Sequence, residues 1–312
     1  MKYAILGAGA MGSIIGAVLK KGGQDVILVD PYQEHMEKIK HEGLHLQMID
    51  QNETVQLATC ANPAEAGPAD VVIILVKGFH TVAAVNGAKG LFREDTIVCS
   101  LQNGLGNEDI LKEMFPHKPI MQGVMWMTGT LTAPGSVKAN VGAGTAIVLG
   151  SVDKTRGSEE AAKNMVAHFH AGGIAAEFTE NVQKHIWAKA VINACVNGPC
   201  AILRINVKSL FNHPLGMKLV EEITQEVVTV AAQKGIQLDY AALMADMVAS
   251  VARAGEHLPS MAQDIRYKRK TEIDFLNGAI AAYGAQLGVP TPANEYVARF
   301  VKIIEESYEF QY

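Results

Sequence analysis

A glycine motif at the start of the chain constrains its fold more than any other feature. The apolar run Tyr3–Leu6 is typical of a strand buried on both faces, and it leads directly into G-x-G-x-x-G at Gly7–Gly12. The first glycine permits a tight turn, the second lets the backbone approach a phosphate, and the third allows close helix–strand packing. The helical stretch Ser13–Lys20 would then point its N-terminal amides at that phosphate. The pattern predicts dinucleotide binding, with an ordinary glycine-rich turn as the alternative.

An acidic residue stands where this motif usually has its partner. Asp30 follows a second strand, Asp25–Val29, and lies 18 residues after the last glycine of the motif. A carboxylate there can accept hydrogen bonds from the ribose hydroxyls of NAD but would repel the 2′-phosphate of NADP. NAD is therefore the expected cofactor, preferred over NADP, with a turn aspartate before Pro31 as the alternative. Three downstream residues could weaken the discrimination: His35, Lys38 and Lys40. The motif residues expected at the cofactor are Gly7, Ala8, Gly9, Ala10, Met11 and Gly12.

Length and composition fit a compact protein of two domains. A chain of 312 residues has room for about two domains and a large core. Its 49% hydrophobic and 19% charged residues argue against disorder. The net charge of −5, with no basic run that could follow a nucleic-acid backbone, argues against a nucleic-acid partner. No run reaches the roughly 18 to 20 apolar residues that cross a membrane, so no membrane partner is expected.

The cysteines are typical of a protein in a reducing compartment. They form no C-x-x-C pair and adjoin no row of histidines, so neither a metal site nor a disulfide framework is expected. The cytoplasm is therefore the expected location. The four cysteines are Cys60, Cys99, Cys195 and Cys200.

Two further strands are expected to end at the same edge of a parallel sheet. Asp70–Lys77 is a continuous apolar run, and Thr96–Gly106 is the next strand, ending in an Asn-Gly turn. The carboxyl ends of such strands face the ligand crevice, so Lys77 and Asn103 should lie toward the cofactor. The alternatives are a solvated lysine and a plain turn asparagine.

Shorter strands and one helix complete the first domain. Residues 44–49 and 54–59 should form a hairpin or a pair of short strands, and Pro119–Gly150 should form antiparallel strands that close one side of the sheet. A helix near 158–171 and a strand near 174–178 follow. The domain should end near Thr179.

Beyond this point almost the whole chain has helical periodicity. Prolines and glycines separate the expected helices, which fall near 181–197, 214–234, 239–254, 260–269, 272–287 and 293–309. The fold class is therefore an α/β Rossmann-type parallel-sheet domain, residues 1–179, followed by an all-α domain, residues 180–312.

Polar residues form a stripe on the first of these helices. Lys189, Asn193 and Asn197 recur every four residues, so they share one face of a helix. Their neighbours within 186–197 are largely apolar, so the helix should be buried and the stripe needs partners or a wet cleft. The alternative is a lysine that reaches the surface beside capping asparagines.

A second polar cluster lies near two later helix starts. Ser260 follows a proline at one start, and Thr271 with Asp274 fits a capping box. From spacing alone, Glu272 between them would be a solvated carboxylate.

Taken in order, five motifs resemble the ketopantoate reductase family, whose helical domain is akin to the C-terminal fold of 6-phosphogluconate dehydrogenase. They are GAGAMG at the start, VK at Lys77, QNGLG around Asn103, WAKAVINACVN, and SMAQDIRYKRKTEIDFLNG. The resemblance implies that Lys189 is the general acid and that Glu272 holds and polarises it. It also implies that Asn193, Asn197 and Ser260 bind a 2-oxo acid, and that Lys77 and Asn103 line the cofactor side. Asn103 is expected to contact the substrate as well.

Two departures from the family pattern bear on the substrate and the cofactor. Asp30 replaces a residue that is commonly basic, and Asn197-Gly198-Pro199-Cys200-Ala201 replaces Asn-Pro-Leu-Thr-Ala. At both places the chain resembles an NAD-dependent branch that forms D-2-hydroxy acids such as D-mandelate.

Three functions follow as expectations. The first is reduction of a 2-oxo acid branched next to the ketone, of ketopantoate (2-dehydropantoate) 2-reductase type, giving the D/(R)-2-hydroxy acid. The second is an NAD-dependent D-2-hydroxyacid (D-mandelate) dehydrogenase, and the third a non-catalytic dinucleotide sensor. The expected partner is a small-molecule 2-oxo acid, and the chain could form a homodimer.

Overall fold

A computed structural model describes residues 1–48, 51–142, 144–254 and 258–311, and contacts within the chain divide it into two compact units. The first unit contains Met1–Gln102 and Asn107–Val182. The second contains Asn103–Gly106 and Gln183–Tyr312. A domain end near Thr179 stays a prediction. By contacts, the first unit ends at Val182, and the short loop Asn103–Gly106 is grouped with the helical second unit.

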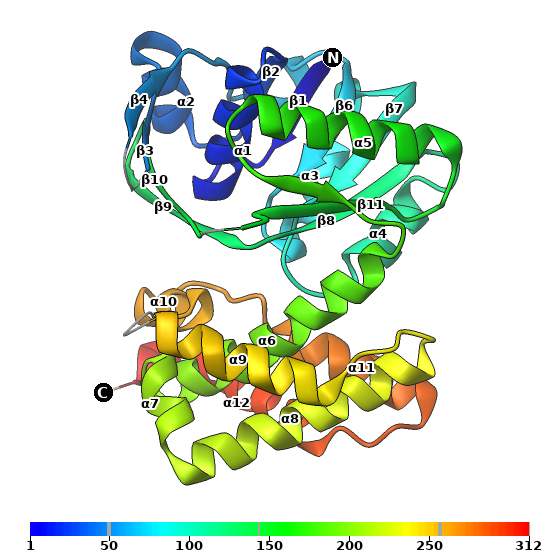
Figure 1. Ribbon diagram of the computed structural model, residues 1–312. Coiled ribbons are helices and arrows are strands. Elements are labelled where there is room, and N and C mark those ends of the chain that lie inside the picture. Colours follow the sequence, from blue (N-terminus) through cyan, green and yellow to red (C-terminus); the bar gives the residue numbers. More distant parts are fainter. Residues whose placement is uncertain (49–50, 143, 255–257, 312) are drawn as a thin grey trace. The chain divides into compact units, whose positions relative to one another are not determined.

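The first unit is built on a large sheet, mostly parallel, that confirms the expected Rossmann-type fold (Figure 1). Its strands are β1 (Lys2–Leu6), β2 (Asp25–Val29), β5 (Ala58–Cys60), β6 (Ala69–Ile74), β7 (Phe92–Ser100), β8 (Ile120–Met125), β11 (Ile147–Ser151) and β12 (Ala176–Phe178). They are ordered β12-β11-β8-β7-β6-β1-β2-β5. Neighbours pair in parallel except β8 and β11, which are antiparallel.

Both faces of this sheet are buried, as the apolar run in β1 predicts. Tyr3 and Ile5 belong to one hydrophobic core, and Ala4 and Leu6 belong to another. Successive side chains of a strand point to opposite faces, so the two cores lie on the two sides of the sheet. The helices of this unit are α1 (Ala10–Lys21), α2 (Gln33–Glu42), α3 (Thr81–Gly87), α4 (Asn107–Met114) and α5 (Arg156–Ala171), with 3-10 turns η1 (Pro63–Glu65), η2 (Gly78–His80) and η3 (Lys89–Leu91).

A second, smaller sheet corrects the expectation for residues 119–150. Its strands are β3 (Leu44–Gln47), β4 (Asn52–Val55), β9 (Met127–Ala133) and β10 (Ser136–Val141), in the order β4-β3-β10-β9. Thus β9 and β10 do not close the side of the main sheet, and β8 runs parallel to β7. The small sheet instead packs on α1, which contacts β1 and β2 on one side and β9 and β10 on the other (Figure 1).

The burial pattern explains this division. All six residues of β8 are buried, as in a central strand. In β9, exposed residues alternate with buried or half-buried ones over most of the strand, as in a strand with one solvated face.

The pair of strands expected at 44–49 and 54–59 is divided between the two sheets. Residues 44–47 and 52–55 form the antiparallel β3–β4 pair, but 58–60 form β5 in the main sheet. Position 49 lies outside the described residues.

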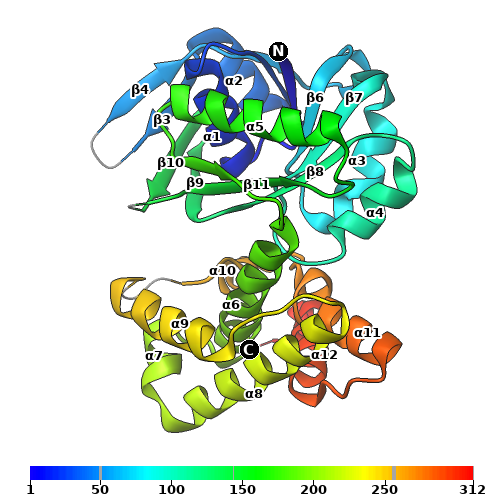
Figure 2. The same ribbon diagram turned by 45° about the vertical axis from the view of Figure 1, so that its right-hand side comes forward.

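The second unit is helical throughout the part that the structure describes (Figure 2). Its elements are α6 (Val182–Leu203), α7 (Val207–Asn212), α8 (Pro214–Gln233), α9 (Tyr240–Ala254), α10 (Ser260–Arg266), α11 (Asn277–Leu287) and α12 (Pro292–Glu306), with 3-10 turns η4 (Ile273–Phe275) and η5 (Tyr308–Phe310). Helix α8 packs against α7, α9, α11 and α12. Helix α6 contacts α8 through Cys195, whose thiol lies 3.3 Å from the hydroxyl of Thr224.

Two helix boundaries differ from the expected ones, and one helix is additional. Helix α6 continues through Pro199 instead of ending near 197, α7 is an additional short helix, and the helix expected from 272 begins only at Asn277. A proline inside a helix removes one N–H and leaves nearby carbonyls short of donors. The carbonyl affected at Pro199 is that of Cys195, and the side-chain amide of Asn277 donates to the neighbouring carbonyl oxygen, that of Ala194, at 3.1 Å.

Among the described helices, α6 alone is long and apolar enough to cross a membrane by length and composition. That is weak evidence, because the core helix of a globular unit has the same length and composition. In α6, 61% of the most apolar window is buried inside the protein.

Candidate active site

The glycine loop of the first unit has the geometry expected of a phosphate-binding turn. Gly7 has φ of +100°, and a Cβ there would lie 2.5 Å from the amide nitrogen of Val76. A Cβ on Gly12 would lie 2.0 Å from the carbonyl oxygen of Gly7, so only glycine lets α1 approach the loop this closely. A Cβ on Gly9 would meet no described atom within 4 Å. The space over Gly9 is open where a pyrophosphate would approach the backbone.

The N-terminus of α1 offers its amides to an anion. Gly9 is the N-cap and has no side chain to cap the helix, and the first turn contains no acidic residue. The first amides of a helix lack partners within the helix and carry its positive dipole end. These features fit the phosphates of a dinucleotide.

Asp30 is joined directly to this loop. Its Oδ2 accepts a hydrogen bond from the amide of Ala8 at 2.8 Å, and its Oδ1 accepts one from the amide of Tyr32 at 2.9 Å. The second bond is the turn contact that the alternative reading implied. Each carboxylate oxygen has a further lone pair, so the turn role and ribose binding are compatible.

Ser13 and His35 stabilise the same loop, a role that the sequence analysis assigned to neither. The side chain of His35 is fully buried, with Nε2 lying 3.0 Å from the hydroxyl of Ser13 and Nδ1 accepting from the amide of Gly135 at 2.8 Å. The Ser13 hydroxyl donates to the carbonyl oxygen of Ala8 at 2.9 Å. Since Nδ1 accepts, His35 carries its proton on Nε2, and burial lowers its pKa. In the sequence, only the presence of one polar residue on each of these two helices could have indicated the contact between Ser13 and His35.

A weakening of cofactor discrimination by His35, Lys38 and Lys40 stays a prediction. His35 is buried in the hydrogen-bond chain to Ser13, and Lys38 forms an ion pair with Glu42 at 2.6 Å, one turn along α2. Lys40 is exposed.

Gln102 positions the segment that contains Lys77. Lys77 follows β6 and is the N-cap of η2, and the preceding residue, Val76, packs against Gly7. The Nε2 of Gln102 donates to the carbonyl oxygen of Val76 and to the hydroxyl of Thr81, both at 2.8 Å. Lys77 is therefore the residue directly after Val76, which contacts the glycine loop. Gln102 is a further residue that the sequence analysis did not select.

In the second unit, Lys189 and Glu272 lie close enough to interact electrostatically. Lys189 is half-buried on α6. Burial lowers the pKa of Lys189 to about 8, and the carboxylate of Glu272 opposes this shift by raising it. Glu272 was expected to begin a helix, but it instead immediately precedes η4. The reason is local: the Thr271 hydroxyl accepts the amide of Ile273 at 3.2 Å, which favours a turn.

Asn197 and Ser260, 63 residues apart, are brought together. The Oδ1 of Asn197 accepts the hydroxyl of Ser260 at 3.2 Å and the amide of Met261 at 3.4 Å. Asn197 is only 5% exposed, so its polar side chain needs such partners. The half-buried Asn193 lies one turn earlier on α6, which completes the expected stripe from Lys189.

The loop containing Asn103 packs on the turn that follows Glu272. The amide of Leu105 donates to the carbonyl oxygen of Phe275 at 2.7 Å. Gly104 has φ of +88°, and a Cβ there would lie 2.3 Å from that same oxygen. Asn103 therefore belongs by its contacts to the helical unit, and its place on the cofactor side stays a prediction. Within the described residues, no group of three His, Cys, Asp or Glu side chains could hold a metal ion.

Family models match both units. The model described as "Ketopantoate reductase PanE/ApbA" matches residues 3–154, and its C-terminal counterpart matches residues 181–305. A 2-dehydropantoate 2-reductase of Streptococcus pyogenes is 33% identical over 308 residues, which cover 98% of this chain and 99% of the relative.

Solved structures give the same relationship. A ternary structure of D-mandelate dehydrogenase with NADH and anilino(oxo)acetate has a TM-score of 0.89 and 33% identity, and covers all of both chains. A 2-dehydropantoate 2-reductase of Geobacter metallireducens has a TM-score of 0.88 and 31% identity, over 97% of this chain and 99% of the other. The matches cover both units, so the chain belongs to the ketopantoate reductase family.

Proposed function

We propose that the protein reduces 2-oxo acids branched next to the ketone to D/(R)-2-hydroxy acids, as a ketopantoate reductase. The observation that carries this proposal is the pairing of Lys189 with Glu272 in the unit that also joins Asn197 to Ser260. A protein that only sensed a dinucleotide would need neither pair. The expected family resemblance and the comparisons support the same reaction type.

The proposed mechanism assigns proton donation to Lys189. A nicotinamide cofactor, when bound, supplies a hydride to the carbonyl carbon of the substrate. Negative charge then builds on the carbonyl oxygen, and the Lys189 ammonium neutralises it and transfers a proton from Nζ to that oxygen. Glu272 keeps the ammonium form populated against the effect of burial. The lysine is left as a neutral amine and recovers its proton from solvent.

Asn193 and Asn197 are the proposed donors to the 2-oxo acid carboxylate, and Ser260, whose single hydroxyl hydrogen is donated to Asn197, is the proposed third residue of this substrate site. In Asn197, Oδ1 accepts from Ser260 and Met261, so its NH2 group is the end of the side chain that can donate to a substrate oxygen. Asn103 would contribute a further amide. Ser260 then acts partly by fixing the orientation of Asn197.

NAD is the proposed cofactor, with NADP disfavoured. The carboxylate of Asp30 lies against the glycine loop, where it would meet the adenosine ribose and repel a 2′-phosphate. Two basic side chains of α2 have other partners, His35 with Ser13 and Lys38 with Glu42.

A D-mandelate type dehydrogenase is the second candidate. The similarity to D-mandelate dehydrogenase and the presence of Asp30 favour it. The departure from the family pattern at residues 198–200 supports a D-mandelate type dehydrogenase less strongly than expected. Gly198 faces Val297 of α12, where a Cβ would lie 2.3 Å from a methyl carbon, so this glycine serves helix packing.

Initial rates separate these functions. Ketopantoate, 2-oxoisovalerate and benzoylformate should each be tested with NADH and with NADPH. We expect turnover of branched 2-oxo acids, with higher kcat/KM for NADH. A preference for benzoylformate of more than about tenfold, or about 1.4 kcal/mol in transition-state binding, would assign the mandelate type. Binding of NADH without turnover of any substrate would indicate a sensor and contradict the proposal.

A homodimer in the cytoplasm is the proposed state of the protein. Helix α12 exposes large apolar side chains that a second copy could cover: Tyr296 at 57%, Phe300 at 49% and Ile303 at 59%. The four cysteines, all within the described part of the chain, are free thiols, as is usual in a reducing compartment. Light scattering coupled to size exclusion tests the dimer, and Phe300→Glu should shift it to monomer.

A further inference from the structure

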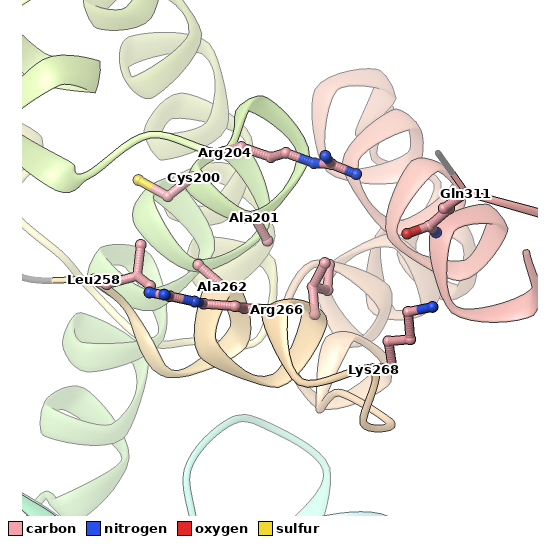
Figure 3. A pocket seen from close by; sticks show the side chains of 9 residues that line it. Cys200, Ala201, Arg204, Leu258, Ala262, Arg266, Lys268 and Gln311 are labelled. Atoms are coloured by element: carbon pink, nitrogen blue, oxygen red, sulfur yellow. The ribbon is translucent and has the colours of Figure 1, made fainter. Parts of the chain in front are cut away.

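The cavity in Figure 3, at the end of α6, does not bring its charged side chains together. Arg204 and Arg266 lie on opposite sides of it and point away from each other. Its lining residue Cys200 lies only three residues after Asn197 on the same helix, so the cavity adjoins the proposed substrate site. A buried group of polar side chains in the first unit, in contrast, is joined from end to end.

This group is a chain of three hydrogen bonds that leads from the turn between β9 and β10 to the glycine loop. The amide of Gly135 donates to Nδ1 of His35 at 2.8 Å. A backbone N–H can only donate, so the proton of the neutral imidazole is on Nε2, which donates to the hydroxyl of Ser13 at 3.0 Å. That hydroxyl donates in turn to the carbonyl oxygen of Ala8 at 2.9 Å.

Burial keeps water out of this chain. The side chains of Ser13 and His35 are both 0% exposed, so neither can exchange its partner for solvent. Burial also lowers the pKa of His35, which keeps the imidazole neutral at pH 7. The hydroxyl hydrogen of Ser13 is therefore left for the Ala8 carbonyl.

The last bond of the chain fixes the peptide unit between Ala8 and Gly9. A trans peptide is planar, so its carbonyl oxygen and its N–H point in opposite directions. Because Ser13 holds the Ala8 oxygen, the N–H of Gly9 points away from Ser13. Gly9 has no side chain to prevent this peptide from turning over. The bond from Ser13 supplies the restraint that the glycine lacks.

The orientation of this peptide decides which charge the loop presents. The amide of Ala8 is already donated to Asp30, so the amide of Gly9 is the next donor along the loop. The space over Gly9 is open, since a Cβ there would meet no described atom within 4 Å. If the peptide turned over, the Ala8 oxygen would replace this N–H and would repel a phosphate. The chain therefore holds the loop in the state that attracts an anion.

We propose that Ser13 and His35 are positioning residues for the pyrophosphate of the cofactor. Acting through the Ala8 carbonyl, they hold the Gly9 amide in the direction that lets it donate to a phosphate oxygen. This role depends on the proposed binding of NADH and adds to it two side chains outside the G-x-G-x-x-G motif. It also connects the turn between β9 and β10 to cofactor binding, because Gly135 sets the tautomer of His35.

Ligands with and without a pyrophosphate separate this role from a general loss of structure. ADP-ribose contains the pyrophosphate and adenosine lacks it, and calorimetric titration gives the affinity of the protein for each. Ser13→Ala should weaken ADP-ribose binding by about tenfold, the loss expected for one hydrogen bond to a charged group. Adenosine binding should change by no more than about twofold.

Ser158→Ala is the matched control. Ser158 is also 0% exposed near the start of a helix, and its hydroxyl lies 2.9 Å from the carbonyl oxygen of Thr155. Since β11 runs antiparallel to β8, α5 begins at the edge of the main sheet opposite to the glycine loop. The control should lower Tm but leave both affinities within about twofold of wild type.

Two replacements of His35 test the path of the chain. The amide nitrogen of glutamine can take the place of Nε2 and donate to Ser13, whereas asparagine is shorter and its oxygen takes the place of Nδ1. His35→Gln should therefore bind ADP-ribose more tightly than His35→Asn, which should lose about as much affinity as Ser13→Ala. Because His35 acts through Ser13, adding His35→Asn to Ser13→Ala should cost no more than about a further twofold.

Unchanged ADP-ribose affinity in Ser13→Ala would overturn the proposal. So would an equal loss of adenosine affinity in that variant, or losses that add in the double variant. Each of these outcomes would leave the proposed function standing. Wild-type protein that bound neither ADP-ribose nor NADH would contradict the proposed function together with this role.

Discussion

Replacing Glu272 with glutamine should move the pH dependence of the reaction. The reduction needs Lys189 in its ammonium form. Burial lowers the pKa of Lys189 to about 8, and Glu272 is the group that opposes this effect. With a pKa of about 8, about nine-tenths of the lysine is protonated at pH 7. Activity in the direction of reduction should therefore be high below pH 8 and fall as the pH rises through that value.

Glu272→Gln removes the opposing charge with little change in size. An opposite charge close to an ionisable group typically shifts its pKa by about one to three units, so the break should move from near pH 8 to about pH 7 or below. At pH 7 the variant would then hold no more than about half of its lysine as ammonium. In the direction of oxidation the neutral amine is the active form, so the rate should instead rise with pH through the same break.

The assay is kcat/KM for the 2-oxo acid between pH 5.5 and 9.5 with saturating NADH. Asp274→Asn is the control, since it removes an exposed carboxylate two residues away that pairs with Lys302 at 2.6 Å. The control should keep the wild-type break. A break that stays in place in Glu272→Gln would mean that Lys189 is not the titrating group, and would refute the reasoning.

Three further predictions follow from single contacts. Asp30→Ser removes both an attraction to the ribose hydroxyls and a repulsion of the 2′-phosphate, so the ratio of kcat/KM for NADH over NADPH should fall by about tenfold or more; an unchanged ratio would exclude Asp30 from discrimination. Glu226→Ala leaves the amides of Ala293 and Asn294 at the start of α12 without their acceptor, now at 2.8 and 3.0 Å, and should cost about 2 to 3 kcal/mol in the free energy of unfolding, measured with urea. Burial lowers the pKa of His35, so the folded state disfavours its charged form. Its stabilising effect should be complete above the ordinary pKa of histidine and be lost as pH falls below it. The fall in Tm between pH 7 and 5 should be smaller in His35→Gln than in wild type.

The sequence predicted those parts of the architecture that depend on residues close together in the chain. The glycine motif and the apolar run before it were sufficient for the Rossmann-type sheet, because turn geometry and burial act within a few residues. The helical stripe at Lys189, Asn193 and Asn197 was predicted for the same reason: helical spacing alone puts these residues on one face.

Long-range partners were not predictable in this way. The stripe indicated that Asn197 needs a hydrogen-bond partner, but not that Ser260, on another helix, supplies it. The small sheet was missed because a half-buried strand such as β9 contains no signal for which strand it pairs with. His35 was selected only as a basic residue downstream of Asp30, although α2 buries it against Ser13.

The most direct test of the proposed mechanism is kcat for Lys189→Ala beside the matched control Lys184→Ala, an exposed lysine on the same helix. Loss of a general acid should lower kcat by about 10² to 10⁴, whereas the control should keep wild-type activity. Affinity for NADH, measured by fluorescence, should be nearly unchanged in both. If Lys189→Ala kept more than about a tenth of wild-type kcat, well outside the range for a general acid, another group would donate the proton and the assignment would be contradicted.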